Sequence, residues 1–333
     1  MAGSSTQPDH RRGDGSGHVL FCTDTFLRDH GPRLRAAAPG LDAVVLDSSD
    51  TIAAADIERA TIAFMSRDTW PARARAFIDG VMAAKSLDWF HVMSAGVDGP
   101  PFDTLRARGV RVTRSAGASA NAMAESVFMF LHGLSRNLRN AHLDYAQRRF
   151  EWHRWRELEH RRIAVLGYGP VGQRIVHLAL AYGMQPTIVR RHARGDEPCP
   201  TRAVNELREI VADHDVIVIA LPVTDDTRNI VSADVIAAMA PETVVINVAR
   251  GALVDQTALT EALKAGRVAG AGLDVFVTEP LPPDDPLWEL PNVLITPHNS
   301  GSSHGSPLRV IDLFFDNLDL YLAGRPMHHE VPR

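Results

Sequence analysis

Three glycines with the spacing of a phosphate-binding loop are the clearest chemical signature of this 333-residue chain. They lie in Gly167-Tyr-Gly-Pro-Val-Gly172, between an apolar run at residues 163–166 and a segment of helical spacing at residues 173–182. In a strand–loop–helix setting the first glycine permits a tight turn, the second lets the backbone approach a pyrophosphate, and the third lets the helix pack on the sheet. This pattern predicts a dinucleotide site that includes Gly167, Gly169, Pro170, Val171 and Gly172.

Basic residues stand where the following strand ends. Arg190 and Arg191 lie about 18 residues past the third glycine, where binders of NAD usually carry an Asp or Glu for the ribose 2′-hydroxyl. A carboxylate would repel a 2′-phosphate, whereas guanidinium groups bind one through charge-assisted hydrogen bonds. The sequence therefore favours NADP(H) and leaves NAD(H) possible.

The elements that must position these residues alternate between strands and helices. One long helix is expected from residue 121 to about 147, and a last helix at residues 308–322. Such alternation predicts an α/β protein with parallel sheets covered on both faces. Apolar runs expected to form strands lie at residues 18–21, 43–46, 62–65, 89–93 and 110–112, and at 163–166, 187–189, 216–220, 244–247, 270–274 and 293–295.

Composition excludes several classes of function. The chain is 45% hydrophobic and 23% charged with a formal net charge of −5, which gives no general attraction to nucleic acid or an anionic membrane. No apolar run reaches the roughly 20 residues that span a bilayer. The two cysteines, Cys22 and Cys199, show no metal-ligand spacing, so we expect no metal site and a reducing, cytoplasmic location. Residues 1–17 are rich in Gly, Ser, Asp and Arg, and we expect them to be disordered.

Several motifs in the second half resemble those of the D-isomer-specific 2-hydroxyacid dehydrogenases, in particular glyoxylate/hydroxypyruvate reductases. The glycine loop is similar, and Leu221-Pro-Val-Thr-Asp-Asp-Thr-Arg228 resembles the family's Pro-Leu-Thr-x-x-Thr segment. Three further matches follow in family order: Asn247-Val-Ala-Arg-Gly-Ala-Leu-Val-Asp255, Gly272-Leu-Asp-Val-Phe-Val-Thr-Glu-Pro-Leu281 and Thr296-Pro-His298.

The resemblance implies two doubly wound parallel-sheet domains, with a Rossmann cofactor domain inserted into a flavodoxin-like substrate domain. Residues 18–120 and 302–333 would form the substrate domain, and residues 121–301 the NAD(P)-binding domain. It implies hydride transfer between NADP(H) and a small 2-oxo or 2-hydroxy acid such as glyoxylate or hydroxypyruvate. The family is generally dimeric, and the aromatic-rich stretch from Tyr145 to Trp155 would suit a homodimer interface.

Reduction of a 2-oxo acid needs an anchored carboxylate, a polarised carbonyl and a proton donor. The fork of Arg250 can hold the carboxylate and the carbonyl oxygen together. His298 would donate the proton, and Glu279 would orient its imidazole and favour the charged form. The amides of Gly96 and Val97, in the turn that begins at Ser94, resemble the family's second carboxylate anchor.

The same motifs extend the expected cofactor site. Asp274 would bind the nicotinamide carboxamide, and the resemblance adds Pro222, Thr227 and Ala249. The chain departs from the family at Thr113-Arg114, where many members carry Thr-Asn before the helix that follows. The substrate can therefore not be carried over from any one relative.

Two alternatives remain open from the sequence. One is a phosphite- or formate-type dehydrogenase of the same fold. Formate dehydrogenases pair the active-site His with Gln, so Glu279 argues against that branch. The other is a non-enzymatic regulator that senses dinucleotides.

Overall fold

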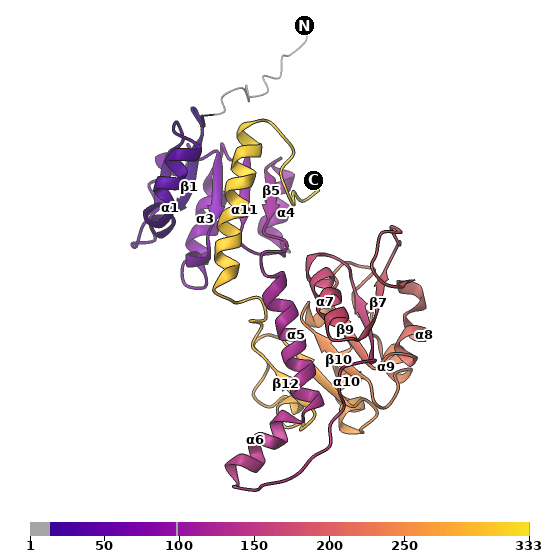
Figure 1. The fold of residues 1–333 in the computed structure, drawn as a ribbon. Coiled ribbons are helices and arrows are strands. Elements are labelled where there is room, and N and C mark those ends of the chain that lie inside the picture. Colours follow the sequence, from indigo (N-terminus) through magenta and orange to yellow (C-terminus); the bar gives the residue numbers. More distant parts are fainter. Residues whose placement is uncertain (1–13, 98, 333) are drawn as a thin grey trace. The chain divides into compact units, whose positions relative to one another are not determined.

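The computed structural model describes residues 14–97 and 99–332. Two compact units divide the chain: Met1–Ala118 with Ser303–Arg333 form unit 1, and Ser119–Ser302 form unit 2 (Figure 1). Unit 2 is thus inserted between two segments of unit 1. These borders lie beside the expected boundaries at residues 120/121 and 301/302, whereas the assignment of substrate and cofactor to the two units stays a prediction.

Unit 1 contains a five-stranded parallel sheet with the order β2-β1-β3-β4-β5. This 2-1-3-4-5 order is the flavodoxin-like arrangement, with the strand order reversing at β1 and β3. The strands are β1 (Val19–Thr23), β2 (Asp42–Leu46), β3 (Ile62–Met65), β4 (Trp89–Val92) and β5 (Arg111–Arg114).

Helices cover both faces of this sheet because its strands are apolar on both sides. Along β1, Leu20 and Cys22 face one core while Phe21 faces the other. The helices α1 (Asp24–Ala37) and α11 (Gly305–Leu322) complete the first core. The second core is completed by α2 (Ala54–Ile57), α3 (Ala74–Ala83) and α4 (Pro100–Ala107).

Unit 2 contains a seven-stranded parallel sheet with the order β12-β11-β10-β9-β6-β7-β8. Counted within the unit, this is 7-6-5-4-1-2-3, the Rossmann order with one more strand. The order reverses between β6 and β9, and ligands of such sheets bind beyond the carboxyl ends of the strands at that point. The strands are β6 (Arg162–Leu166), β7 (Gln185–Arg190), β8 (Thr201–Ala203), β9 (Val216–Ile219), β10 (Val244–Asn247), β11 (Gly270–Leu273) and β12 (Val293–Ile295).

The strands of unit 2 are likewise buried on both faces. In β6, Ile163 and Val165 pack with α5 (Ala120–Ser135) and α7 (Pro170–Ala181), whereas Ala164 and Leu166 face the other core. That core is completed by α8 (Leu207–Ala212), α9 (Ala233–Ala237) and α10 (Gln256–Lys264). The prediction of two parallel-sheet α/β domains is confirmed.

Three sequence expectations need correction. The long helix expected from 121 to 147 is two helices, α5 and α6 (Leu138–Ala146), because Asn137 adopts a left-handed φ of 50° that a continuous helix does not allow. The short edge strand β8, which follows Pro200 and has no apolar run, was not expected. Residues 1–13 lie outside the described residues, but residues 14–17 form a turn tied to Gly40 and not the expected disordered end.

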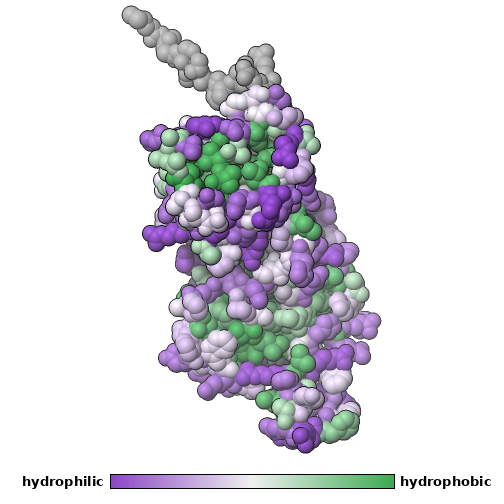
Figure 2. Space-filling model, turned by 90° about the vertical axis from the view of Figure 1, so that its left-hand side faces the viewer, coloured by the Kyte–Doolittle hydropathy of each residue, from purple (hydrophilic) through white to green (hydrophobic). Residues whose placement is uncertain are grey.

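The surface is mixed in character. On the face drawn in Figure 2, each unit shows hydrophobic residues among hydrophilic ones. Among the residues that the structure describes, no helix is long and apolar enough to cross a membrane.

Candidate active site

The three predicted catalytic residues follow three neighbouring strands of unit 2. Arg250 comes after β10, Glu279 after β11 and His298 after β12. These strands pair in register side by side. Because the carboxyl ends of parallel strands meet at one edge of the sheet, the structure brings the loops that carry all three residues to the same edge.

His298 and Glu279 are in direct contact. The imidazole Nδ1 lies 2.7 Å from Glu279 Oε2, and the other carboxylate oxygen accepts the Phe276 N–H at 3.0 Å. The acid is therefore fixed by its own loop while it orients the ring. With Nδ1 engaged, Nε2 is the ring nitrogen available to exchange a proton with a substrate. Both side chains are partly exposed, which such an exchange requires.

Asp274 makes the hydrogen bonds that hold the loop carrying His298. Its carboxylate is buried and accepts hydrogen bonds from the Thr296 hydroxyl at 2.6 Å and from the N–H groups of Asn299 and Ser300. Its carbonyl accepts the His298 N–H at 2.8 Å. These bonds hold His298 in a left-handed conformation with a φ of 50°, which is uncommon outside glycine. The structure thus gives Asp274 a positioning role, and its expected contact with a nicotinamide carboxamide stays a prediction.

The loop that carries Arg250 is held from both sides. Asn247, at the end of β10, donates from its side-chain amide to the Arg250 carbonyl at 2.9 Å and accepts the Ala249 N–H at 3.0 Å. Arg250 Nη1 donates to the Ala249 carbonyl at 2.8 Å. Gly251 follows and is the first residue of the short helix η3 (Gly251–Leu253). It lies close against the backbone of Phe276, which belongs to the segment that leads to Glu279. Sequence reasoning missed the contributions of Asn247 and Gly251, although both lie in the motif that drew attention to Arg250.

The glycine loop has the geometry that its sequence predicts. Gly167 has a φ of +101°, and a Cβ there would lie 2.6 Å from the Ala220 carbonyl oxygen. A Cβ on Gly172 would lie 2.0 Å from the Gly167 carbonyl oxygen. A Cβ on Gly169, which caps α7, would meet no atom within 4 Å. The start of α7 is therefore open to a pyrophosphate, and Pro170 at its first position removes an N–H that a helix start does not need. These residues fit a dinucleotide.

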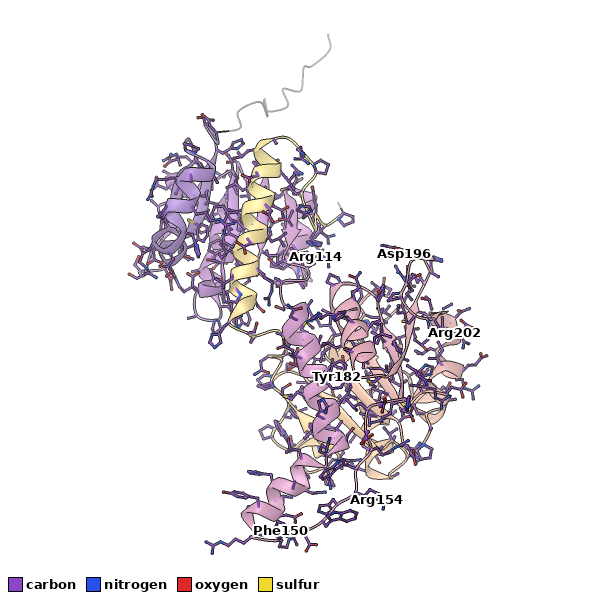
Figure 3. The ribbon with its side chains drawn as sticks, in the orientation of Figure 1. Arg114, Phe150, Arg154, Tyr182, Asp196 and Arg202 are labelled. Atoms are coloured by element: carbon purple, nitrogen blue, oxygen red, sulfur yellow. The ribbon has the colours of Figure 1, made fainter. Side chains whose placement is uncertain are left out.

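Arg190 and Arg191 both have acidic partners. Arg190 Nη1 donates to Glu197 Oε1 at 3.0 Å, and Arg191 is ion-paired with Asp226. The side chain of Glu197 is nearly fully buried and also accepts the N–H groups of Arg194 and Gly195, each at 2.8 Å. Those backbone bonds, aided by the Arg190 charge, lower the pKa of the Glu197 carboxyl. The loop from β7 to β8, whose tip carries Asp196 in Figure 3, is thus built around Glu197, which the sequence analysis did not single out.

The remaining predicted cofactor residues lie after β9 and β10. The Thr227 hydroxyl donates to the Pro222 carbonyl and accepts the Thr224 N–H, both at 2.7 Å, so it shapes the loop after β9. Pro222 is exposed and Ala249 is buried. The loops predicted to bind the cofactor thus follow β6, β7, β9 and β10, at the same edge of the sheet as the predicted catalytic residues.

The predicted carboxylate-anchor turn belongs to unit 1 and follows β4. The Ser94 hydroxyl donates to the Gly96 carbonyl at 2.6 Å and so closes the turn. Within residues 14–97 and 99–332, no acceptor takes the N–H of Gly96 or of Val97. Ser94 therefore shapes the turn, and the two amides are the groups able to bind an anion. The described residues contain no cluster of three or more His, Cys, Asp or Glu that could hold a metal ion.

Comparison with known proteins agrees with this geometry. A sequence model of the family described as "D-isomer specific 2-hydroxyacid dehydrogenase, NAD binding domain" matches residues 128–300. The chain is 32% identical over 244 residues to glyoxylate/hydroxypyruvate reductase B of Pectobacterium carotovorum, covering 70% of this chain and 75% of that protein.

Two solved structures are similar over nearly the whole chain. A D-isomer specific 2-hydroxyacid dehydrogenase family protein from Aeromonas salmonicida has a TM-score of 0.79 at 31% identity, covering 95% of this chain and 99% of that one. A D-isomer specific 2-hydroxyacid dehydrogenase from Xanthobacter autotrophicus, solved with NADPH and MES, has a TM-score of 0.76 at 29% identity, covering 95% and 98% of the two chains.

A Rossmann sheet whose strand ends carry a glycine loop and a paired histidine and carboxylate defines an oxidoreductase that uses a nicotinamide cofactor. The family match narrows this class. The chain belongs to the D-isomer specific 2-hydroxyacid dehydrogenase family.

Proposed function

We propose that the protein reduces a small 2-oxo acid, such as glyoxylate or hydroxypyruvate, to the corresponding 2-hydroxy acid. The observation that carries the proposal is the 2.7 Å contact between His298 Nδ1 and Glu279 Oε2, at the sheet edge where the Arg250 loop also lies. The similarity to the Pectobacterium reductase supports the substrate class.

Each group at the site has a separate role in the proposed reaction. The bound nicotinamide supplies a hydride to the carbonyl carbon. His298 holds a proton at Nε2 and delivers it to the carbonyl oxygen as negative charge develops there. Glu279 stabilises the imidazolium that holds this proton. The guanidinium of Arg250 and the amides of Gly96 and Val97 bind the substrate carboxylate, so one carbonyl face is presented to the hydride.

NADP(H) is the cofactor that we propose, with NAD(H) as the weaker substrate. Gly167, Gly169 and Gly172 would receive the pyrophosphate at the start of α7. Arg190 and Arg191 would bind the 2′-phosphate. They stand at the end of β7, where NAD-binding proteins usually carry an Asp or Glu. Each keeps further guanidinium donors beside the one given to Glu197 or Asp226. The Xanthobacter structure with NADPH supports this choice.

A homodimer is the second part of the proposal. Several large apolar side chains of α6 and the segment after it are exposed, including Tyr145 at 79% and Trp152 at 80% of their surface. Phe150, fully exposed, lies beyond the end of α6 in Figure 3. Aromatic groups are enriched in protein interfaces, so this surface suits a second copy. A sedimentation mass of two chains at micromolar concentration would support the dimer, and a mass of one chain would contradict it.

A cytoplasmic location is proposed on chemical grounds. Cys22 and Cys199 are both free thiols in the structure. Burial raises the pKa of the Cys22 thiol to about 12, so it is unreactive.

The decisive assay follows nicotinamide absorbance with each cofactor and a substrate panel. The panel contains glyoxylate, hydroxypyruvate, pyruvate and phenylpyruvate for reduction, and phosphite and formate for oxidation. We expect NADPH oxidation with the small 2-oxo acids. Turnover of phosphite or formate alone would assign the chain to the alternative dehydrogenases. No turnover of any compound, together with tight cofactor binding, would favour the dinucleotide-sensing regulator.

A further inference from the structure

Arg114 is a charged residue at a position of unit 1 that the proposed chemistry leaves unused. It ends β5, as Figure 3 shows, on the sheet edge where the 94–97 turn follows the neighbouring strand β4. Arg114 Nη1 donates to the Ala95 carbonyl at 3.2 Å. This bond holds the guanidinium against the turn that carries the amides of Gly96 and Val97.

Within the described part of the chain, the charge of Arg114 has no acidic partner. Among residues 14–97 and 99–332, no carboxylate lies within ion-pair distance of it. Acidic side chains of the same sheet edge gather instead around Arg73, which pairs with Asp24 at 2.8 Å and with Asp50 at 2.7 Å. Arg114 also acts on a histidine: the pKa of His329 is lowered by burial and then by the charges of His328 and Arg114. The surroundings of Arg114 thus favour an anion.

We propose that Arg114 binds a second carboxylate of the substrate, so that the preferred substrates are 2-oxo acids with two carboxylates. The proposal rests on the proposed function, because Gly96 and Val97 mark where the first carboxylate binds. A monocarboxylic 2-oxo acid would leave the Arg114 guanidinium without an acidic partner, whereas a short dicarboxylic acid would pair it.

The first carboxylate does not need Arg114. Its two oxygens accept about four hydrogen bonds. The proposed function assigns these bonds to Arg250 and to the amides of Gly96 and Val97. In that assignment the guanidinium of Arg114, beside the same turn, is left for a second anionic group.

The test compares substrates of equal length that differ only in the terminal group, on the full-length enzyme with NADPH. The pairs are ketomalonate against pyruvate and oxaloacetate against 2-oxobutyrate. We expect the wild type to have the higher kcat/KM for the diacid of each pair. Arg114→Met should lower kcat/KM for the diacids by roughly tenfold to a hundredfold, the range expected for one charged hydrogen bond, and change the monoacids less than threefold.

Three further measurements keep the result unambiguous. Arg114→Lys keeps the charge without the fork and should retain part of the diacid preference. Arg75→Met removes a fully exposed arginine of α3 and should leave every ratio unchanged. The shift in Tm on adding succinate or butyrate to the enzyme–NADP⁺ complex measures the preference for a diacid over a monoacid without turnover.

Two results would overturn the proposal. Equal losses for both members of each pair in Arg114→Met would make Arg114 an anchor for the first carboxylate or a structural residue. A wild type that prefers the monoacids would exclude a second carboxylate. Failure of the proposed function has a different signature, namely no reduction of any 2-oxo acid, glyoxylate and hydroxypyruvate included, by NADPH or NADH.

Discussion

Gly251 lies so close to Phe276 that a Cβ on Gly251 would be 2.0 Å from the Phe276 carbonyl carbon. This approach joins the segment after β10, which carries Arg250, to the segment after β11, which carries Glu279. Phe276 also donates its N–H to the Glu279 carboxylate at 3.0 Å. The spacing of the segments that carry Arg250 and Glu279 therefore depends on residue 251 having no side chain.

Gly251→Ala should damage stability and activity together. The added methyl group cannot be accommodated without moving backbone, and overpacking of this kind costs about 1–3 kcal/mol. We expect a lower urea midpoint and a lower kcat/KM for 2-oxo acid reduction. Gly31→Ala in α1 is the matched control, because its Cβ would meet the flexible end of Arg35 at 3.3 Å and Leu27 in ordinary contact at 3.8 Å, and no backbone outside the helix. Full activity in Gly251→Ala would show that the two segments tolerate displacement.

The paired His298 and Glu279 predict a characteristic pH dependence. Reduction consumes the proton of the imidazolium, so reductive kcat/KM should be flat at low pH and fall as pH rises. Oxidation of the 2-hydroxy acid needs neutral imidazole and should show the opposite trend. Glu279→Gln keeps a hydrogen-bond acceptor for Nδ1 but removes the negative charge beside the ring, so reductive kcat should fall. His298→Ala should lower kcat by roughly a hundredfold or more, the usual scale for a positioned acid.

Cofactor affinity separates this role from misfolding. NADPH binding, measured by fluorescence titration, should be little changed in His298→Ala because the glycine loop follows a different strand. If His298→Ala keeps a substantial reductive rate with the wild-type pH profile, another group delivers the proton.

Substitutions at Arg190 and Glu197 should change the preference for NADPH over NADH in opposite directions. Arg190→Asp should lower kcat/KM for NADPH by roughly tenfold or more while NADH is less affected, since it removes a charged hydrogen bond and adds repulsion. Glu197→Gln has nearly the same size and removes a negative charge beside the expected 2′-phosphate, at the cost of one backbone hydrogen bond that the amide NH2 cannot accept. The ratio of kcat/KM for NADPH to that for NADH should then rise threefold or more.

Glu206→Gln is the control for this pair of variants. Glu206 also accepts a guanidinium hydrogen bond, from Arg202 at 2.7 Å, but it lies beyond β8 and outside the loop that follows β7. Its substitution should leave the cofactor ratio unchanged. A wild type that prefers NADH by tenfold or more would contradict the assignment of Arg190 and Arg191.

The sequence predicted most strands because those strands are buried on both faces and appear as continuous apolar runs. The strands β3, β10 and β12 fall where the apolar runs placed them. It could not predict β8, a three-residue edge strand held by pairing with β7 and not by apolar burial. Nor could it predict the helix break at Asn137, because the apolar spacing gives no sign of one residue in a left-handed conformation.

The candidate site divides in the same way. Residues proposed to carry chemistry, such as Arg250, Glu279 and His298, lie in motifs of fixed spacing and were therefore singled out from the sequence. Residues that hold them, such as Asn247 and Glu197, act through single hydrogen bonds to backbone or side chains far from any pattern. Asp274 was singled out for an expected contact with the nicotinamide, which stays a prediction. Its hydrogen bonds to the loop that carries His298 could not be foreseen, because a carboxylate that caps a loop looks the same in sequence as one that faces a ligand.

His91 predicts how the stability of unit 1 depends on pH. Its side chain is fully buried on β4, with Nδ1 2.7 Å from the Thr113 hydroxyl and Nε2 3.1 Å from the Ser115 hydroxyl. Burial lowers its pKa to about 3. In the unfolded chain an unperturbed histidine has a pKa of about 6.5, so the unfolded state takes up a proton first as pH falls. Stability that is present above about pH 6.5 should be lost progressively toward pH 3.

The loss assigned to His91 should be about 2 kcal/mol between pH 7.5 and pH 5. The pKa values of His214 and His329 are also lowered by burial, so the wild-type pH dependence contains several contributions and only a difference isolates His91. Urea titrations give the free energy of unfolding at pH 7.5 and at pH 5. The difference between these two values should be smaller in His91→Gln than in the wild type, whatever the absolute stability of the variant. His177→Gln, at an exposed site on α7, should keep the wild-type difference. An unchanged difference in His91→Gln, or ring nitrogen shifts of a charged His91 in the folded protein at pH 5, would show that the buried imidazole takes up its proton without unfolding.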